Sequence, residues 1–223
     1  HKKNKRKIEH NVESIKNNIF VGPSYSNDEI KSFLDINKIH YKFLETNSLL
    51  ETTAKLISEG NVVGWYQGKM EWGPRALGNR SILADPRNAK MKDILNEKIK
   101  HREAFRPFAP CILEEYTSEY FDIDISSPYM LLVAPVKKPE KIPAVTHVDG
   151  TSRLQTVSKY VNPLFYDLIN EFYKITGVPV LVNTSMNVRG EPIVNTIEQA
   201  YNMITKTDMD YIVLGNHIVT KGD

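Results

Sequence analysis

Short apolar segments alternate along this chain with longer segments whose apolar residues recur at helical spacing. The apolar runs at 61–67, 108–113 and 178–185 have the length of strands, and several of them end in polar loops. Residues 163–177 form an amphipathic pattern with proline near its start and glycine at its end, which is typical of a helix. Strands interleaved with helices predict an α/β fold, in which ligands commonly bind beyond the strand ends.

The rest of the chain continues this alternation. Helices are predicted over the apolar spacing of 88–100 and where a capping residue stands three positions before a glutamate: Ser26 with Glu29, Ser48 with Glu51, and Asn195 with Glu198. Further strands are predicted at 19–22, 41–45, 81–85, 130–136, 153–157 and 211–220. Because the last segment resembles a hairpin, we expect a mixed sheet rather than a purely parallel one.

Length and composition limit the organisation of the chain. Its 223 residues, 41% of them hydrophobic, suit one large domain with at most a small appendage. We expect residues 1–18 to be a flexible basic tail or a domain-junction linker, and residues 19–223 to be the domain. The sequence has no apolar run of membrane-spanning length, no visible secretory signal and a single cysteine, so we expect no membrane contact and a cytoplasmic location.

Positive charge is concentrated in two stretches, although the formal net charge is only +2. Residues 69–106 hold ten lysines and arginines against five acidic residues, and residues 1–7 hold five basic residues and no acidic one. Such concentration favours an anionic partner. The stretch 69–106 also contains glycines, prolines and aromatic residues, which makes it the better candidate for a specific site.

Three segments combine charge with backbone irregularity. In "GPRALGNR" (73–80), two glycines permit close approach of the backbone, and Arg75 and Arg80 supply permanent cations. In "KIKHREAFRPFAP" (98–110), prolines prevent a continuing helix, and aromatic residues stand beside four cations: Lys98, Lys100, Arg102 and Arg106. These segments also have plainer interpretations, as a surface turn and as a solvated basic edge.

The third segment, "LVNTSMNVRGEP" (181–192), is an apolar strand that turns abruptly polar. It carries neutral hydrogen-bonding groups and one cation, which suit a small polar substrate or phosphate oxygens: Asn183, Thr184, Ser185, Asn187 and Arg189. Ordinary turn chemistry is the alternative explanation. Together the three segments predict a cleft lined by cations that faces an Asn/Ser-rich strand end and binds a small phosphate compound, such as a nucleotide.

Other chemistries are not indicated. The chain has neither a P-loop nor a G-x-G-x-x-G motif, and its six histidines are scattered with no pair at i, i+4, so we expect no metal site built by the protein. Cys111 stands within an apolar run, and we expect it in the core rather than as a nucleophile. We expect Trp65 in the core as well.

Long motifs in this chain closely resemble the C-terminal domain of the O-carbamoyltransferases of nodulation and antibiotic biosynthesis. The resemblance runs from about Phe20 to Leu214 and is carried by "MEWGPRALGNRSILADPR", "IKHREAFRPFAP", "SRLQTV" and "VPVLVNTSMNVRGEPIV". It implies a YrdC-like fold, a twisted mixed sheet flanked by helices. Trp72 keeps an aromatic residue at a position where members of the family often have one, whereas Met186 and His101 stand where an aromatic residue is commoner. We expect these changes to reshape the pocket wall while every polar group is kept.

The resemblance also implies roles for individual residues. The phosphate-binding positions of the family fall on Arg75, Lys100, Arg102, Arg106 and Arg153, and we expect Lys100, Arg102 and Arg153 to be catalytic. The positions that hold the carbamoyl end fall on Asn183 and Ser185, with Asn187 and Arg189 as weaker candidates on the same loop.

The activity implied is the formation of carbamoyl adenylate from carbamoyl phosphate and ATP, with Mg²⁺ arriving on the nucleotide. In this family a separate N-terminal domain, related to the Kae1 fold, passes the carbamoyl group to an acceptor hydroxyl. Nothing in this chain resembles that domain, so we expect it elsewhere in the same full-length protein. Two alternatives remain: a YrdC-like module that binds RNA or nucleotides without carbamoyl chemistry, and an interaction domain with a vestigial pocket. The sequence has no run of alternating aromatic and basic residues of the kind that binds single-stranded nucleic acid, so we do not expect nucleic acid as a partner.

Overall fold

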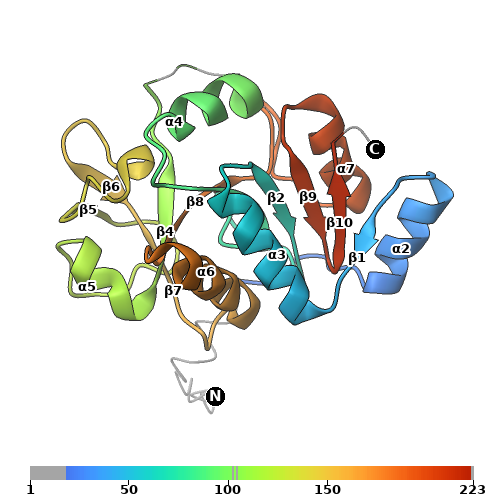
Figure 1. Ribbon diagram of the computed structural model, residues 1–223, viewed down its shortest axis with the longest axis horizontal. Helices are drawn as coiled ribbons and strands as arrows, with labels where there is room; N and C mark the ends of the chain where they lie inside the picture. The colour runs from blue at the N-terminus through green and yellow to red at the C-terminus, as the bar shows by residue number, and fades with distance from the viewer. Residues whose placement is uncertain (1–18, 102, 104, 222–223) are drawn as a thin grey trace, which may run out of the picture.

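The computed structural model describes residues 19–101, 103 and 105–221, apart from the side chain of Lys98. The predicted tail at 1–18 and the candidate Arg102 lie outside these residues. Eight strands form one sheet (Figure 1), in the spatial order β1 (Lys42–Phe43), β10 (His217–Thr220), β9 (Tyr211–Leu214), β2 (Val63–Tyr66), β3 (Arg80–Ala84), β8 (Val180–Ser185), β4 (Ala109–Leu113) and β7 (Gln155–Val157). The pairs β2–β9 and β4–β7 are parallel and the other neighbours are antiparallel, which confirms the predicted mixed sheet.

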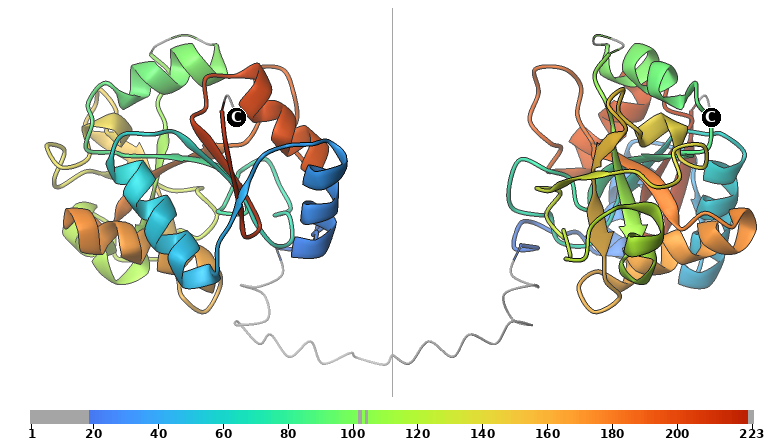
Figure 2. Two further views of the ribbon diagram at one scale, coloured as in Figure 1. Left: turned by 45° about the vertical axis from the view of Figure 1, so that its right-hand side comes forward. Right: turned by 90° about the vertical axis from the view of Figure 1, so that its left-hand side faces the viewer.

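Helices pack around this sheet. The longest are α3 (Thr46–Ser58) and α6 (Pro163–Thr176), which contact each other and lie together on one side of the strands (Figures 1 and 2). The other helical elements are α2 (Asn27–Ile36), α4 (Met91–Ile94) with its π-helical continuation η1 (Leu95–Lys100), η2 (Glu114–Tyr116), α5 (Thr117–Tyr120), η3 (Pro143–Val145) and α7 (Ile197–Lys206). The α/β class expected from the alternating pattern is therefore confirmed.

Two strand predictions need correction. The segment 153–157 is not one strand, because it breaks at the fully buried Leu154 into β6 (Thr151–Arg153) and β7. Strand β6 pairs instead with β5 (Val133–Pro135) in a separate two-stranded sheet. The predicted strand at 19–22 is reduced to an isolated bridge between Phe20 and Glu71.

Helix starts were predicted correctly in one case of three. Ser26 and Glu29 form a complete capping box at the start of α2. Helix α3, however, begins after Glu45, because the buried Leu49 and Leu50 fix its first turns by packing. The predicted capping role of Asn195 was also wrong: helix α7 is capped by Thr196 with Gln199, while the Asn195 carbonyl accepts a hydrogen bond of 2.7 Å from the Tyr66 hydroxyl.

Strand register brings the candidate segments together at one end of the strands, on the side of the sheet where β8 ends. Ser185 at the end of β8 lies opposite Ser81, and Asn183 lies opposite Ala109, so β3 and β4 begin where β8 ends. Strand β7 runs parallel to β4, which places Arg153 at this same edge just before β7. Trp65 and Cys111 are fully buried, as predicted. Among the described residues, no helix has both the length and the apolar character needed to cross a bilayer.

Candidate anion-binding site

Two adjoining cavities lie at this edge of the sheet. The first has a volume of about 430 Å³, solvent at its mouth included, and is lined by residues of all three motif segments, among them Arg75, Phe108, Arg153, Asn183 and Ser185. The second, of about 680 Å³, shares Arg75, Phe108 and Arg153 with the first and adds Arg106 and His147. The fold thus assembles most of the predicted site residues from distant parts of the chain.

The arginine loop that precedes β3 is held by buried polar groups. Glu71 is 2% exposed, and its Oε1 accepts hydrogen bonds from the backbone N–H groups of Leu77, Asn79 and Arg80. The fully buried Arg80 donates to four backbone carbonyls and stacks 3.7 Å from the centre of the Tyr66 ring. Arg80 therefore fixes the loop, and Arg75 is the arginine of this loop that reaches the cavities.

Arg75 and Arg153 share the cavities without a neutralising carboxylate. No acidic side chain of the described residues lies within 4.0 Å of either guanidinium. Burial, and secondly the charge of Arg75, lower the pKa of Arg153. The buried Nε of Arg153 also has no hydrogen-bond partner. Two like charges repel each other in a partly buried cavity, and a bound anion would stabilise both of them.

Asn183 presents an unpaired oxygen beside these cations. Its side chain is 1% exposed, and Nδ2 donates to the Ala76 carbonyl at 3.2 Å and to Oε1 of Gln155 at 2.8 Å. Its Oδ1 is buried and has no partner. Because an unpaired buried acceptor is costly, the geometry suits a ligand that brings an N–H or O–H group to this oxygen.

Lys100 is directed to the loop that follows β8. Its side chain is 4% exposed, and Nζ donates to the Ser185 carbonyl at 2.5 Å and to the carbonyl and Oδ1 of Asn187, both at 2.9 Å. Oδ1 of Asn187 also accepts from the Ser185 hydroxyl at 2.6 Å, and its Nδ2 donates to the Glu191 carbonyl. In this arrangement Lys100 and Asn187 shape the loop, while Ser185 lines the cavity.

The two remaining candidate arginines lie at the rim. Arg106 lines the second cavity, and its Nε lies 3.1 Å from Oε2 of Glu103. Arg189 is more exposed and reaches the other oxygen of Glu103 at 3.7 Å. Glu103 thereby joins the segment before β4 to the loop after β8.

Sequence analysis missed several residues that the fold brings to this place. Glu71 and Gln155 gave no signal, because their roles depend on backbone groups far away in sequence. His147 lines the second cavity and belongs to a tight turn, "HVDGT" (147–151), whose Asp-Gly pair is a recognisable turn signal. Among the described residues no group of three or more His, Cys, Asp or Glu side chains could hold a metal ion.

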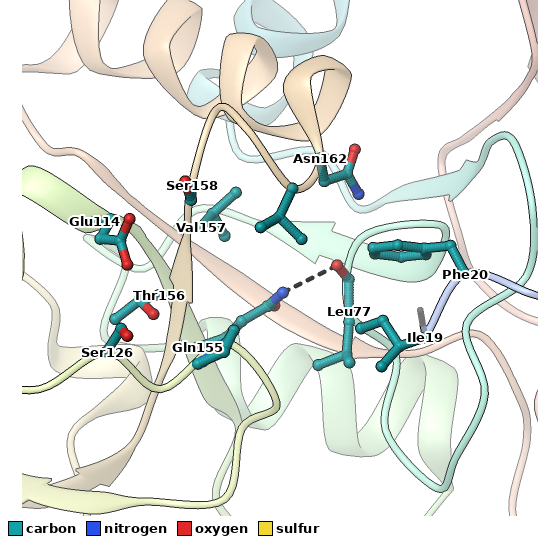
Figure 3. Close-up of a pocket in the computed structure, with 12 residues that line it drawn as sticks. Ile19, Phe20, Leu77, Glu114, Ser126, Gln155, Thr156, Val157, Ser158 and Asn162 are labelled. Carbon is teal, nitrogen blue, oxygen red and sulfur yellow. Dashed lines mark hydrogen bonds between the residues drawn. The ribbon is translucent and has the colours of Figure 1, made fainter. Parts of the chain in front are cut away.

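A further pocket, of about 390 Å³ with open solvent included, is also lined in part by Gln155 (Figure 3). There Nε2 of Gln155 donates to the Leu77 carbonyl at 2.9 Å, close to Ile19 and Phe20 (Figure 3). The residues that line it include no lysine or arginine. It does not share the cationic character of the two cavities.

Comparison with known proteins decides the family. A family model described as the carbamoyltransferase C-terminus matches residues 54–221. The chain belongs to this carbamoyltransferase C-terminal family. It is 43% identical to nodulation protein NolO of Bradyrhizobium diazoefficiens over 91% of this chain and 38% of that protein. It is 42% identical to the 3'-hydroxymethylcephem-O-carbamoyltransferase of Amycolatopsis lactamdurans over 72% of this chain and 31% of that protein.

The match covers only part of the relatives. The chain spans 28 to 38% of the length of the first three curated relatives that it matches. Among solved structures, the domain resembles P. abyssi Sua5 in complex with L-threonine, with a TM-score of 0.57 and 18% identity over 78% of this chain and 48% of that one. This likeness confirms the YrdC/Sua5-like fold of the carbamoyltransferase C-terminal domain.

Proposed function

We propose that this carbamoyltransferase domain forms carbamoyl adenylate from carbamoyl phosphate and ATP. The observation that carries the proposal is the pair of adjoining cavities in which Arg75 and Arg153 lie without a carboxylate partner. Both substrates are phosphate anions, and a guanidinium binds phosphate oxygens through paired, charge-assisted hydrogen bonds. The family match to proteins named as carbamoyltransferases supports the choice of carbamoyl chemistry.

Each part of the site has a task in this proposal. Arg75, Arg106 and Arg153 bind phosphate groups and stabilise the negative charge that develops as phosphate and pyrophosphate leave. The free oxygen of Asn183 accepts a hydrogen bond from the carbamoyl amide, and Ser185 lies beside it at the end of β8. Lys100 keeps the loop after β8 in place through its three hydrogen bonds.

Magnesium enters this scheme as part of the substrate. Mg²⁺ prefers phosphate and water oxygens and commonly binds nucleotides with few protein ligands. The cavities are lined by cationic and neutral groups, so the phosphates of ATP supply the ligands of the ion. Transfer of the carbamoyl group to an acceptor hydroxyl is assigned to a part of the full-length protein outside this chain, in keeping with the partial coverage of the relatives.

Pyrophosphate release tests the proposal. In the intact protein, release should require both ATP and carbamoyl phosphate, and Arg153→Ala or Arg75→Ala should reduce it at least about 100-fold, the loss typical of one transition-state contact. Arg87→Ala is the matched control, because Arg87 pairs with Asp85 at 2.6 Å outside both cavities. Release that needs ATP alone, or full turnover in both cavity variants, would contradict the proposal.

A further inference from the structure

The turn at 147–151 places a histidine on the wall of the second cavity. His147 is partly buried and lines this cavity together with Arg75, Arg106 and Arg153. The turn is closed by a hydrogen bond of 2.8 Å from the His147 N–H to the Thr151 carbonyl and by one of 3.0 Å from the Gly150 N–H to the His147 carbonyl. The imidazole is therefore carried by a rigid, internally bonded turn rather than by a loose loop.

A chain of three side chains fixes the orientation of the ring. The Thr151 hydroxyl donates to Oδ1 of Asp149 at 2.7 Å, and the same Oγ1 lies 3.2 Å from Nδ1 of His147. A hydroxyl has one proton, and this proton is given to the carboxylate, so Oγ1 accepts a hydrogen bond from Nδ1–H of the histidine. The neutral ring then has its lone pair on Nε2, the nitrogen that makes no hydrogen bond within the turn.

Burial favours the unprotonated form of the His147 imidazole. It lowers the pKa of His147 below the ordinary value of 6.5, while the charge of Asp149 acts in the opposite direction and the charge of Arg153 lowers the pKa again. Hydrogen bonds from the Thr151 side chain and backbone lower the pKa of Asp149, so this carboxyl is ionised at neutral pH and remains an acceptor.

We propose that His147 is the general base of the first step of the reaction. The inference rests on the proposed function, in which carbamoyl phosphate must lose phosphate to give carbamate before ATP is attacked. Water attacks the carbonyl carbon, and Nε2 of His147 takes one proton from that water as the C–O bond to phosphate breaks. The electron pair of this bond leaves with phosphate, the carbamic acid proton passes to the phosphate, and the histidine returns its proton to solvent.

The other polar groups that line the two cavities are poor proton acceptors at neutral pH. The arginines of the cavity stabilise the departing phosphate but hold no unprotonated nitrogen at neutral pH. Asn183, Thr184 and Ser185, the neutral polar residues that line the first cavity, do not ionise usefully in this range. A neutral imidazole is thus the group of these cavities suited to accept a proton, and positioned bases of this kind typically contribute a factor of about 10² to 10⁴ in rate.

The test separates this step from the attack on ATP. In the intact protein, His147→Gln should lower phosphate release from carbamoyl phosphate by at least about 100-fold, while calorimetric ATP binding stays within about threefold of wild type, a difference below 1 kcal/mol. Supplying ammonium carbamate bypasses the hydrolysis, so pyrophosphate release by His147→Gln should return to the wild-type rate with the same reagent. His40→Gln is the control, because His40 is exposed and precedes β1.

The pH profile gives a second readout. Wild-type phosphate release should fall as the pH drops through the lowered pKa of His147, and His147→Gln should lack this acid limb. Thr151→Val keeps the shape of the side chain but removes the hydroxyl, so it should reduce kcat and leave ATP binding and carbamate rescue intact. If His147→Gln does not fold, Thr151→Val alone decides: unchanged kcat would overturn the role of the turn.

Two further results would overturn the inference. These are phosphate release by His147→Gln within about twofold of wild type, and a defect in this variant that carbamate does not repair. Either leaves the proposed function standing, provided that the wild type releases pyrophosphate with both substrates. If the wild type releases neither phosphate nor pyrophosphate, both the proposed function and the base are rejected.

Discussion

Replacing Lys100 by methionine should destabilise the domain far more than the loss of an ordinary lysine. Nζ of this 4% exposed side chain makes hydrogen bonds of 2.5, 2.9 and 2.9 Å to the Ser185 carbonyl and to the carbonyl and Oδ1 of Asn187. Methionine fills a similar volume but leaves the two carbonyls without this donor, while Oδ1 of Asn187 keeps the hydrogen bond from the Ser185 hydroxyl. Each hydrogen bond to a charged group contributes about 1.5–3 kcal/mol, and a buried acceptor that is left without a donor costs about 1–3 kcal/mol.

Two such carbonyls lose their donor, so we expect Lys100→Met to lower the free energy of unfolding by about 3–5 kcal/mol, toward the lower end because water reaches the half-buried loop. Denaturant unfolding of the 223-residue chain measures this directly. Thermal unfolding should show a midpoint lower by about 6–20 °C, at about 2–4 °C per kcal/mol for a domain of this size.

Lys31→Met is the matched control. Lys31 pairs with Asp35 at 2.6 Å, but both side chains are about half exposed, and such surface pairs contribute at most about 1 kcal/mol. If Lys100→Met lost less than about 1 kcal/mol, and so resembled the control, the buried clamp on the loop after β8 would not be a stabilising contact, and a role of Lys100 toward substrate would regain priority.

Three further predictions follow from buried or strained positions. Gly78→Ala should lower the free energy of unfolding by about 1–3 kcal/mol more than Gly73→Ala does. Both glycines have positive φ, but a Cβ at Gly78 would lie 2.2 Å from the Phe165 ring, whereas a Cβ at Gly73 would meet open space. Equal losses in the two variants would argue against the close approach of Gly78 to Phe165. Cys111 should resist alkylation in the native chain at mildly alkaline pH and react fully in denaturant, because complete burial raises the pKa of its thiol, and native labelling at the denatured rate would contradict its position. Without ligand, Arg153→Met should leave the free energy of unfolding unchanged or raise it by up to about 1 kcal/mol. The substitution removes a cation that has no acidic partner but is partly screened by solvent. A decrease of more than about 1 kcal/mol would mean that Arg153 has a stabilising partner.

The sequence predicted the fold class and the convergence of the motifs because local patterns dominate there. The β-branched run that becomes β8, and the proline and glycine that bound α6, fix these elements almost without tertiary context. The convergence of the motifs also depends on strand register, and the polar ends of the strands indicated it. Five candidate residues line the two cavities, and binding of a phosphate compound there stays a prediction: Arg75, Arg106, Arg153, Asn183 and Ser185.

Other features depend on contacts that no local pattern encodes. The segment 153–157 alternates like one strand, but burial of Leu154 divides it between two sheets. Arg80 was grouped with Arg75 by composition alone, and only the fold shows that Arg80 is buried against backbone carbonyls. His147 was set aside as an isolated histidine, since its hydrogen-bonded neighbours are ordinary turn residues in sequence.

Calorimetric titration with ATP tests the central claim most directly, because that claim is a single anion site formed by arginines from distant segments. Wild type should bind ATP, and Arg75→Met and Arg153→Met should each weaken the Kd by at least about tenfold, the equivalent of one charge-assisted hydrogen bond. Arg87→Met, whose arginine pairs with Asp85, should bind as the wild type does. Unaltered affinity in both cavity variants, or equal weakening in all three, would contradict the account.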